Sequence, residues 1–127
     1  MLRRRSRTPE GFTLIELLIV VVIIGILASI AIPKFHNSKE QAYIAAMRED
    51  VRNLATAEEA YYSDNSGMYA TSTAALGTNY KASAGVTVTL LGTASSWRAT
   101  ARNPATTVSC RLAAGTTKSY DGAVVCK

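Results

Sequence analysis

Residues 12–32 read FTLIELLIVVVIIGILASIAI, and this stretch decides the fold of the N-terminal part of the chain. It holds 21 residues, and Glu16 is its one charged side chain. A helix of that length spans about 30 Å, the thickness of the hydrocarbon core of a bilayer. The alternative is a buried core helix, but a chain of 127 residues has too little other apolar mass to surround it. The stretch therefore predicts a membrane-spanning helix.

The basic charge of the chain is concentrated just before this stretch. The net charge is +5, and four of the fourteen Lys and Arg residues are Arg3, Arg4, Arg5 and Arg7. Cations on this side of the span predict a cytoplasmic N-terminus and a C-terminal part across the membrane. A nucleic-acid reader would spread cations along one folded element. We see no such stripe in residues 40–127, so nucleic-acid binding is not predicted.

A secretory signal is a second interpretation of the same stretch. Ser29-Ile30-Ala31 fits a small-x-small cleavage site, with the cut after Ala31. The apolar run is longer than the 7–15 residues or so of a signal core. Glu16 also argues against a disposable signal, because a carboxylate inside an apolar segment costs about 2.5–3.5 kcal/mol on insertion scales.

Two explanations of Glu16 remain open. Thr13 and Glu16 match a capping box, in which the carboxylate returns a hydrogen bond to the Thr13 amide. Alternatively, Glu16 meets a cation at the same membrane depth. No Lys or Arg of this chain is placed there, but a free amino terminus at Phe12 would supply the charge.

Gly11-Phe12-Thr13-Leu14-Ile15-Glu16, preceded by a short basic leader, resembles the prepilin cleavage site of type IV pilins and type II secretion pseudopilins. The resemblance implies that a membrane peptidase removes residues 1–11, cutting after Gly11, and then N-methylates Phe12. It also implies that Glu16, with Thr13 beside it, acts in assembly by pairing with the amino terminus of a neighbouring subunit. The family further implies that the helix between Gly25 and Pro33 can unwind inside an assembled fibre.

The helical period continues from Lys34 to about Ser63. Ile44, Met47, Val51, Leu54 and Tyr61 form an apolar stripe, in which Glu58 occupies the missing position. We place Glu40, Arg48, Glu49, Asp50, Arg52 and Glu59 on the other faces. This half of the helix is amphipathic and requires a partner layer. Asp64-Asn65-Ser66-Gly67 is a helix-stop signal.

A Thr/Ala/Gly-rich connector follows over residues 68–84, and then short segments alternate apolar and polar residues. The apolar members are Val86, Val88, Leu90; Trp97, Ala99, Ala101; Val108, Cys110, Leu112; and Val124–Cys126. This period of two predicts an antiparallel sheet of about four strands that covers the half-helix and leaves a Thr/Arg face to solvent. The predicted fold is α+β and pilin-like: one helix over about residues 12–63, whose C-terminal half packs on the sheet. Residues 12–33 form the membrane and assembly half-helix, and residues 34–127 form the periplasmic domain.

Cys110 and Cys126 are the two cysteines, and both lie on predicted strands. In an oxidising compartment a disulfide is favoured, and two reduced thiols are the alternative. The family often closes its C-terminal segment with such a bridge, and residues 118–121 would form the tip of that loop. We expect no metal site, cofactor or catalytic residue: phosphate loops, H-E-x-x-H and G-x-S-x-G motifs are missing. His36 is assigned no chemistry.

The resemblance implies a structural subunit of a type IV pilus, serving adhesion, twitching motility or DNA uptake. It would be drawn from the bacterial inner membrane into a helical filament of copies of itself by a platform and an assembly ATPase, after contact with lipid and with prepilin peptidase. The first alternative is a pseudopilin of a type II secretion system. The second is a Sec-exported or membrane-anchored binding domain cut after Ala31.

Overall fold

The computed structural model describes residues 11–116 and 121–127. The element order is α1 (Leu14–Asp64), η1 (Thr73–Asn79), β1 (Thr87–Gly92), β2 (Trp97–Arg102), β3 (Ser109–Ala114) and β4 (Val125–Cys126). The predicted α+β pilin-like class is confirmed. Compact units form on either side of residue 37, and α1 contributes to both.

The long helix α1 has 51 residues and begins and ends close to the predicted bounds. It ends where Ser66 and Gly67 adopt positive φ values of 58° and 75°. The Gly67 amide then donates to the Tyr62 carbonyl at 3.0 Å, which satisfies a carbonyl of the last turn.

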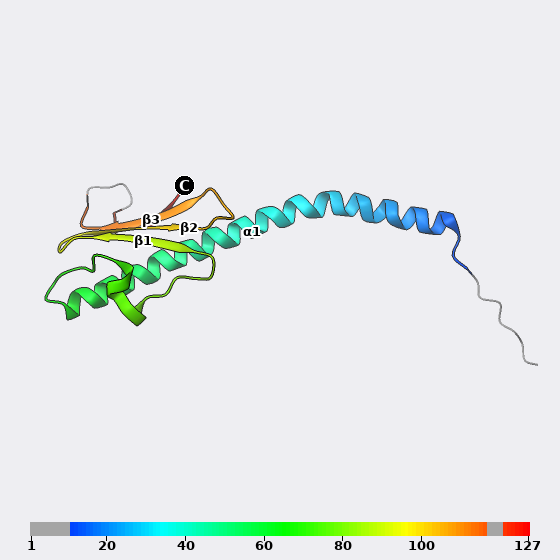
Figure 1. Cartoon of the computed structure of the whole chain (residues 1–127). Coiled ribbons are helices and arrows are strands. Elements are labelled where there is room, and N and C mark those ends of the chain that lie inside the picture. The colour runs from blue at the N-terminus through cyan, green and yellow to red at the C-terminus, as the bar shows by residue number, and fades with distance from the viewer. Residues whose placement is uncertain (1–10, 117–120) are drawn as a thin grey trace, which may run out of the picture. The chain divides into compact units, whose positions relative to one another are not determined.

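The four strands form one antiparallel sheet in the order β1-β2-β3-β4. Its layer lies along the second half of α1 (Figure 1). The register places Leu90, Ala99 and Leu112 in one row across β1, β2 and β3. This row is buried, which confirms that these alternating positions form the inner face.

The core lies between this inner face and one stripe of α1. Met47, Val51 and Leu54 from the helix are fully buried, and Trp97 from β2 is 2% exposed. These helix positions step by four and three residues, so they share one face. The apolar stripe predicted from the sequence is therefore confirmed for its central members.

Two features of this domain differ from the sequence-based expectations. The connector over residues 68–84 contains the 3₁₀ helix η1, whose Leu76 is buried. Asp50, which we expected on an outer face of the helix, is 1% exposed. It is tolerated because its carboxylate accepts hydrogen bonds from the Ser83 amide at 3.0 Å and the Ser83 hydroxyl at 2.8 Å.

Candidate functional site

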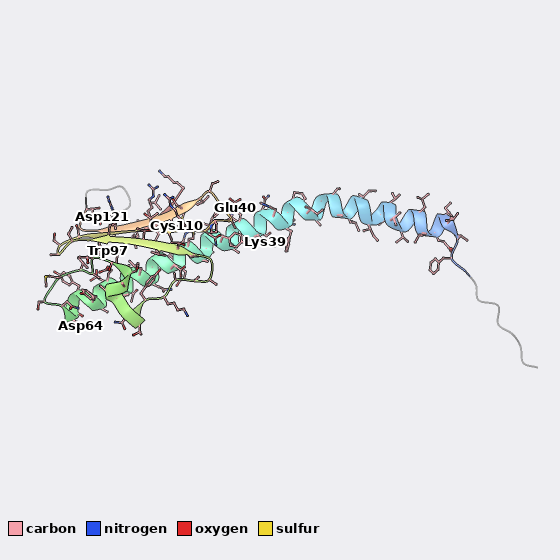
Figure 2. All side chains as sticks on the ribbon, viewed as in Figure 1. Lys39, Glu40, Asp64, Trp97, Cys110 and Asp121 are labelled. Atoms are coloured by element: carbon pink, nitrogen blue, oxygen red, sulfur yellow. A yellow bond between two sulfur atoms is a disulfide. The ribbon has the colours of Figure 1, made fainter. Side chains whose placement is uncertain are left out.

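The first half of α1 presents apolar side chains in every direction. Its side chains over residues 14–37 are exposed, except for the half-buried Ala28, and Figure 2 draws the side chains along α1 as sticks. The large exposed members are Phe12, Leu14, Ile15, Leu17, Leu18, Ile19, Val20, Val21, Val22, Ile23, Ile24, Ile26, Leu27, Ile30, Ile32 and Phe35. Among the described residues, α1 is the one helix long and apolar enough to cross a membrane. So large an apolar surface requires lipid or other protein to cover it.

Thr13 and Glu16 form a capping box at the start of this half-helix. The Thr13 amide donates to Glu16 Oε2 at 2.8 Å, and the Thr13 hydroxyl donates to the same oxygen at 2.7 Å. The Glu16 amide donates back to Thr13 Oγ1 at 3.3 Å. Within the described residues, the hydrogen bonds of this carboxylate all fall on Oε2, so Oε1 stays open to a further donor.

Gly11 and Phe12 precede the helix in exposed, irregular backbone. No described atom lies within 4 Å of the position that a Cβ on Gly11 would take. Both residues of the predicted cleavage site are therefore exposed in the part of the chain that the structure describes. The rest of the predicted leader, residues 1–10, lies outside the described residues.

Gly25 and Pro33 both lie inside α1, which passes through them as a continuous helix. The predicted unwinding concerns the assembled fibre, so it stays a prediction. Ser29, one helical turn beyond Gly25, turns its hydroxyl inward and donates to the Ile26 carbonyl at 2.7 Å.

Carboxylates on the second half of α1 bind two connectors: residues 68–84 at two points, and the loop between β2 and β3 at one. Besides Asp50, the buried Glu58 accepts a hydrogen bond from the Ala70 amide at 2.9 Å, and Glu40 accepts one from the Thr106 hydroxyl at 2.9 Å. Glu58 Oε1 is buried without a hydrogen-bond partner among the described residues. This burial raises the pKa of Glu58 above its ordinary value. The sequence placed Glu58 in the apolar stripe, but its partner lies 12 residues away and no local motif indicates it.

Cys110 and Cys126 form a disulfide. They are register partners on β3 and β4, on the same inner face as the core. The bond fastens the two-residue strand β4 to the sheet. Three of the four residues of the predicted loop tip, Lys118 to Tyr120, lie outside the described residues, and Asp121 is exposed.

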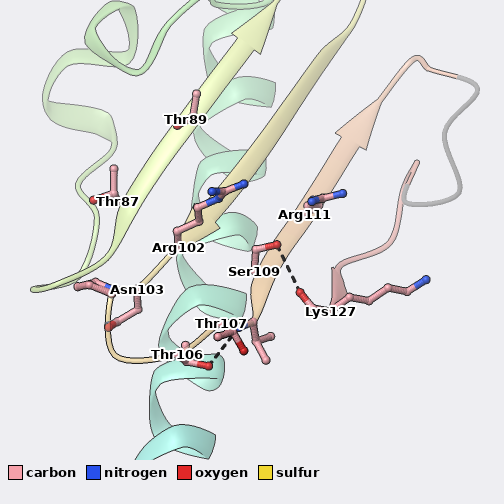
Figure 3. Close-up of a pocket in the computed structure, with 11 residues that line it drawn as sticks. Thr87, Thr89, Arg102, Asn103, Thr106, Thr107, Ser109, Arg111 and Lys127 are labelled. Atoms are coloured by element: carbon pink, nitrogen blue, oxygen red, sulfur yellow. Dashed lines mark hydrogen bonds between the residues drawn. The ribbon is translucent and has the colours of Figure 1, made fainter.

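The outer face of the sheet carries cations that sequence analysis did not recognise as a group. Arg98, Arg102 and Arg111 are exposed, and Arg102, Arg111 and Lys127 line one open groove (Figure 3). The expectation that residues 40–127 show no stripe of cations concerned a single folded element, and it did not address cations that several strands bring to one face. The cations lie on different strands, so strand pairing gathers residues that are far apart in the sequence.

The comparisons with known proteins concern at most half of the chain. Residues 7–32 match the family model described as the prokaryotic N-terminal methylation motif. The chain is 41% identical over 61 residues to type II secretion system core protein G of Pseudomonas aeruginosa, covering 48% of this chain and 43% of that protein. It is 46% identical over 55 residues to type IV major pilin protein PilA of Myxococcus xanthus, covering 43% and 25%. A fimbrial protein of Pseudomonas aeruginosa is 47% identical over 53 residues, covering 42% and 34%.

These matches confirm the resemblance to type IV pilins and type II secretion pseudopilins. The aligned region spans less than half the length of each of these relatives. The same matches cover 42–48% of this chain.

Proposed function

We propose that this chain, which resembles type IV pilins and type II secretion pseudopilins, is a structural subunit of a type IV pilus filament. The single observation that carries the proposal is the half-helix of α1, which is apolar on every side and carries one carboxylate, at Glu16. In a membrane this surface contacts lipid. In a filament the same surface packs against the half-helices of other copies.

Processing at Gly11 creates the second charge that the site requires. Cleavage before Phe12 leaves a free amino group four residues from Glu16, at the same end of the helix. The Thr13 bonds occupy Glu16 Oε2, so Oε1 is available to a neighbouring subunit's amino terminus. Capping and assembly are thus compatible functions of one carboxylate. A buried charge pair of this kind fixes the register of packed helices.

The proposed location follows from the charge distribution. The Arg-rich leader stays in the cytoplasm, α1 spans the inner membrane once, and the disulfide-bonded domain folds in the periplasm before the subunit enters the fibre. Prepilin peptidase, the membrane platform and the assembly ATPase are the proposed partners. We assign no catalytic role to the chain itself.

The first experiment is mass spectrometry of the mature N-terminus in the native host. A methylated Phe12 is expected. A chain that begins at Ile32 would instead identify a secreted domain cut after Ala31, and one that keeps its leader arginines in the fibre would contradict processing.

A pseudopilin of a type II secretion system is the second candidate, favoured by the match to core protein G. Deletion of the gene separates the two. Loss of surface filaments with normal secretion supports the pilus, whereas accumulation of exported proteins in the periplasm with normal surface filaments supports the secretion system.

A further inference from the structure

The outer face of the sheet carries a basic groove. The groove has a volume of about 780 Å³ and opens on the face opposite α1 (Figure 3). Hydroxyls from Thr87, Thr89 and Ser109 line it together with Arg102 and Arg111. No Asp or Glu side chain is among its described lining residues. Guanidinium groups bind oxyanions through two parallel hydrogen bonds and hydroxyls add single donors, so the lining fits a phosphate group.

Two arginines are held close together in this groove. Arg102 is the register partner of Ser109, and Arg111 follows two residues later on β3. The arginines are therefore diagonal neighbours, about 7–8 Å apart at their backbones. In the described part of the chain, neither guanidinium has a carboxylate within the 4.0 Å of an ion pair. Lys127 adds an ammonium group, but its backbone oxygen accepts from the Ser109 amide at 2.8 Å, so the two arginines carry the charge of the site.

The groove lies over the part of α1 that follows the apolar half-helix. Thr106 at its rim donates to Glu40 at 2.9 Å, and Cys110 Sγ on β3 lies 3.8 Å from the Ile44 carbonyl oxygen. Glu40 and Ile44 follow Ile32, the last residue of the apolar stretch, by eight and twelve residues. Within the continuous helix α1 this separation is about 12–18 Å along the axis. A tilt of the helix in the membrane only lowers the height of these positions above the bilayer.

This height is within reach of the charge on the membrane surface. The headgroup layer extends about 5–7 Å beyond the hydrocarbon core on each side. Arginine side chains cover several ångström of the rest, and the gap that remains is shorter than the Debye length of about 8–10 Å. Glu40 is an acidic side chain at the same level, but its carboxylate accepts the Thr106 hydroxyl. Lys34 and Lys39, between the span and the groove, have the same sign of charge as the groove.

A protein partner fits this groove less well than a headgroup. Stable protein contacts need apolar or aromatic anchors at their centre. Pro104 and Val108 are the only apolar residues among the described lining of the groove. A phospholipid headgroup presents phosphate oxygens and no apolar anchor, which matches a lining of guanidinium and hydroxyl groups.

We propose that the groove around Arg102 and Arg111 docks the domain on anionic phospholipid headgroups of the membrane that holds α1. The inference rests on the proposed membrane-anchored state, and it applies equally to a pilus subunit and to a pseudopilus subunit. Docking holds the domain of an unassembled subunit against the membrane surface. Entry into a filament then requires the release of these headgroup contacts.

The test places the full chain in lipid nanodiscs and measures how closely the domain approaches the bilayer surface. Discs of phosphatidylcholine are compared with discs of phosphatidylcholine and phosphatidylglycerol in equal parts, and both contain a lipid with a nitroxide-labelled headgroup. Paramagnetic broadening of the backbone amides of residues 103–109 gives the ratio of docked to free domain. We expect stronger broadening in the anionic discs, and its loss at about 1 M salt, where the Debye length is about 3 Å. Equal broadening in the two kinds of disc would overturn the proposal.

The key variant is Arg102→Gln/Arg111→Gln, and its matched control is Arg48→Gln/Arg52→Gln, which removes the same charge from exposed positions on α1. The control arginines follow Ile32 by sixteen and twenty residues, about 24–30 Å along the helix. Each cation near an anionic surface strengthens docking about fivefold, so the groove variant should lower the docked-to-free ratio about 30-fold. Equal effects of the two variants, or no effect of the groove variant, would overturn the proposal. If circular dichroism shows that the groove variant misfolds, Arg102→Gln alone replaces it, with an expected loss of about fivefold.

Two controls identify what fails if the expected broadening is not seen. A chain that enters neither kind of disc would contradict the membrane anchor and the docking with it, whereas an inserted chain without broadening in anionic discs would contradict the docking alone. Soluble glycerol phosphate at millimolar concentration should leave the docked-to-free ratio unchanged. Its displacement of the domain from the surface would identify a site for a free anion and overturn the assignment to membrane headgroups.

Discussion

The carboxylate of Glu16 combines two functions that substitution can separate. Glu16→Gln keeps an oxygen acceptor for the capping box and removes the charge. Thr13→Ala removes the hydroxyl that donates to Oε2 at 2.7 Å and keeps the charge. We expect Glu16→Gln to block filament assembly and Thr13→Ala to permit it, with both proteins inserted in the membrane and folded.

The expected magnitudes differ enough to be distinguished. Loss of the cap at Thr13 costs about 1 kcal/mol, which is about a fivefold change in an equilibrium constant. An amino terminus buried in a filament without its carboxylate costs about 3–5 kcal/mol, which is about 150- to 5,000-fold for each subunit added. The charge therefore dominates assembly, and the cap mainly sets where α1 begins.

The assay compares sheared filaments with the membrane pool by immunoblot in the native host. Wild type and Thr13→Ala should divide between the two fractions, and Glu16→Gln should remain in the membrane. Normal filament yield from Glu16→Gln would refute the charge pairing. An assembly block in Thr13→Ala as complete as that in Glu16→Gln would show instead that the cap is the essential feature.

The other predictions concern the folded domain and are measured by urea unfolding of the full chain in detergent micelles. Replacing Cys110 and Cys126, whose sequence separation is 16, with Ser should lower the free energy of unfolding by about 3 kcal/mol. An unfolding free energy of the wild type that stays the same after addition of a reductant would contradict this. The raised pKa of Glu58 stabilises the fold fully below its ordinary value of 4.5, and that stability is lost as pH rises through the raised value. As pH rises above 4.5, the urea midpoint of the wild type should thus fall more steeply than that of Glu58→Gln, and parallel curves would rule out Glu58 as the source. Gly92→Ala should lower the free energy of unfolding by about 1–3 kcal/mol, because the new Cβ would collide with the Ala70 carbonyl oxygen. An unchanged urea midpoint would show that the backbone at Ala70 moves aside without cost.

The elements with a regular period could be predicted from the sequence. The helix followed from an apolar run joined to a stripe of period 3.6, and the strands followed from alternation around Trp97 and Leu112. In each case one residue's environment is set by its near neighbours along the chain. The prepilin-like segment around Gly11 and Glu16 is likewise contiguous, which is why the resemblance was visible in a short stretch.

The features that the sequence did not predict depend on pairing between distant residues. Asp50 can be buried because Ser83 donates hydrogen bonds to it. No local sequence pattern links these two residues. The cations on the outer face belong to different strands, and only the register brings Arg102 beside Arg111. The alternation did identify the outward positions, so a count of charges on that face would have found them.

The three carboxylates of α1 that hold the connectors have a mechanical consequence. Glu40, Asp50 and Glu58 attach the helix to its domain at intervals of ten and eight residues. A force applied along the axis of this half-helix is shared among these attachments and the apolar contacts between them, so they are loaded together in shear. Such an arrangement resists extraction of the helix better than one terminal contact would. In a subunit under tension, the helix and the domain would therefore move together.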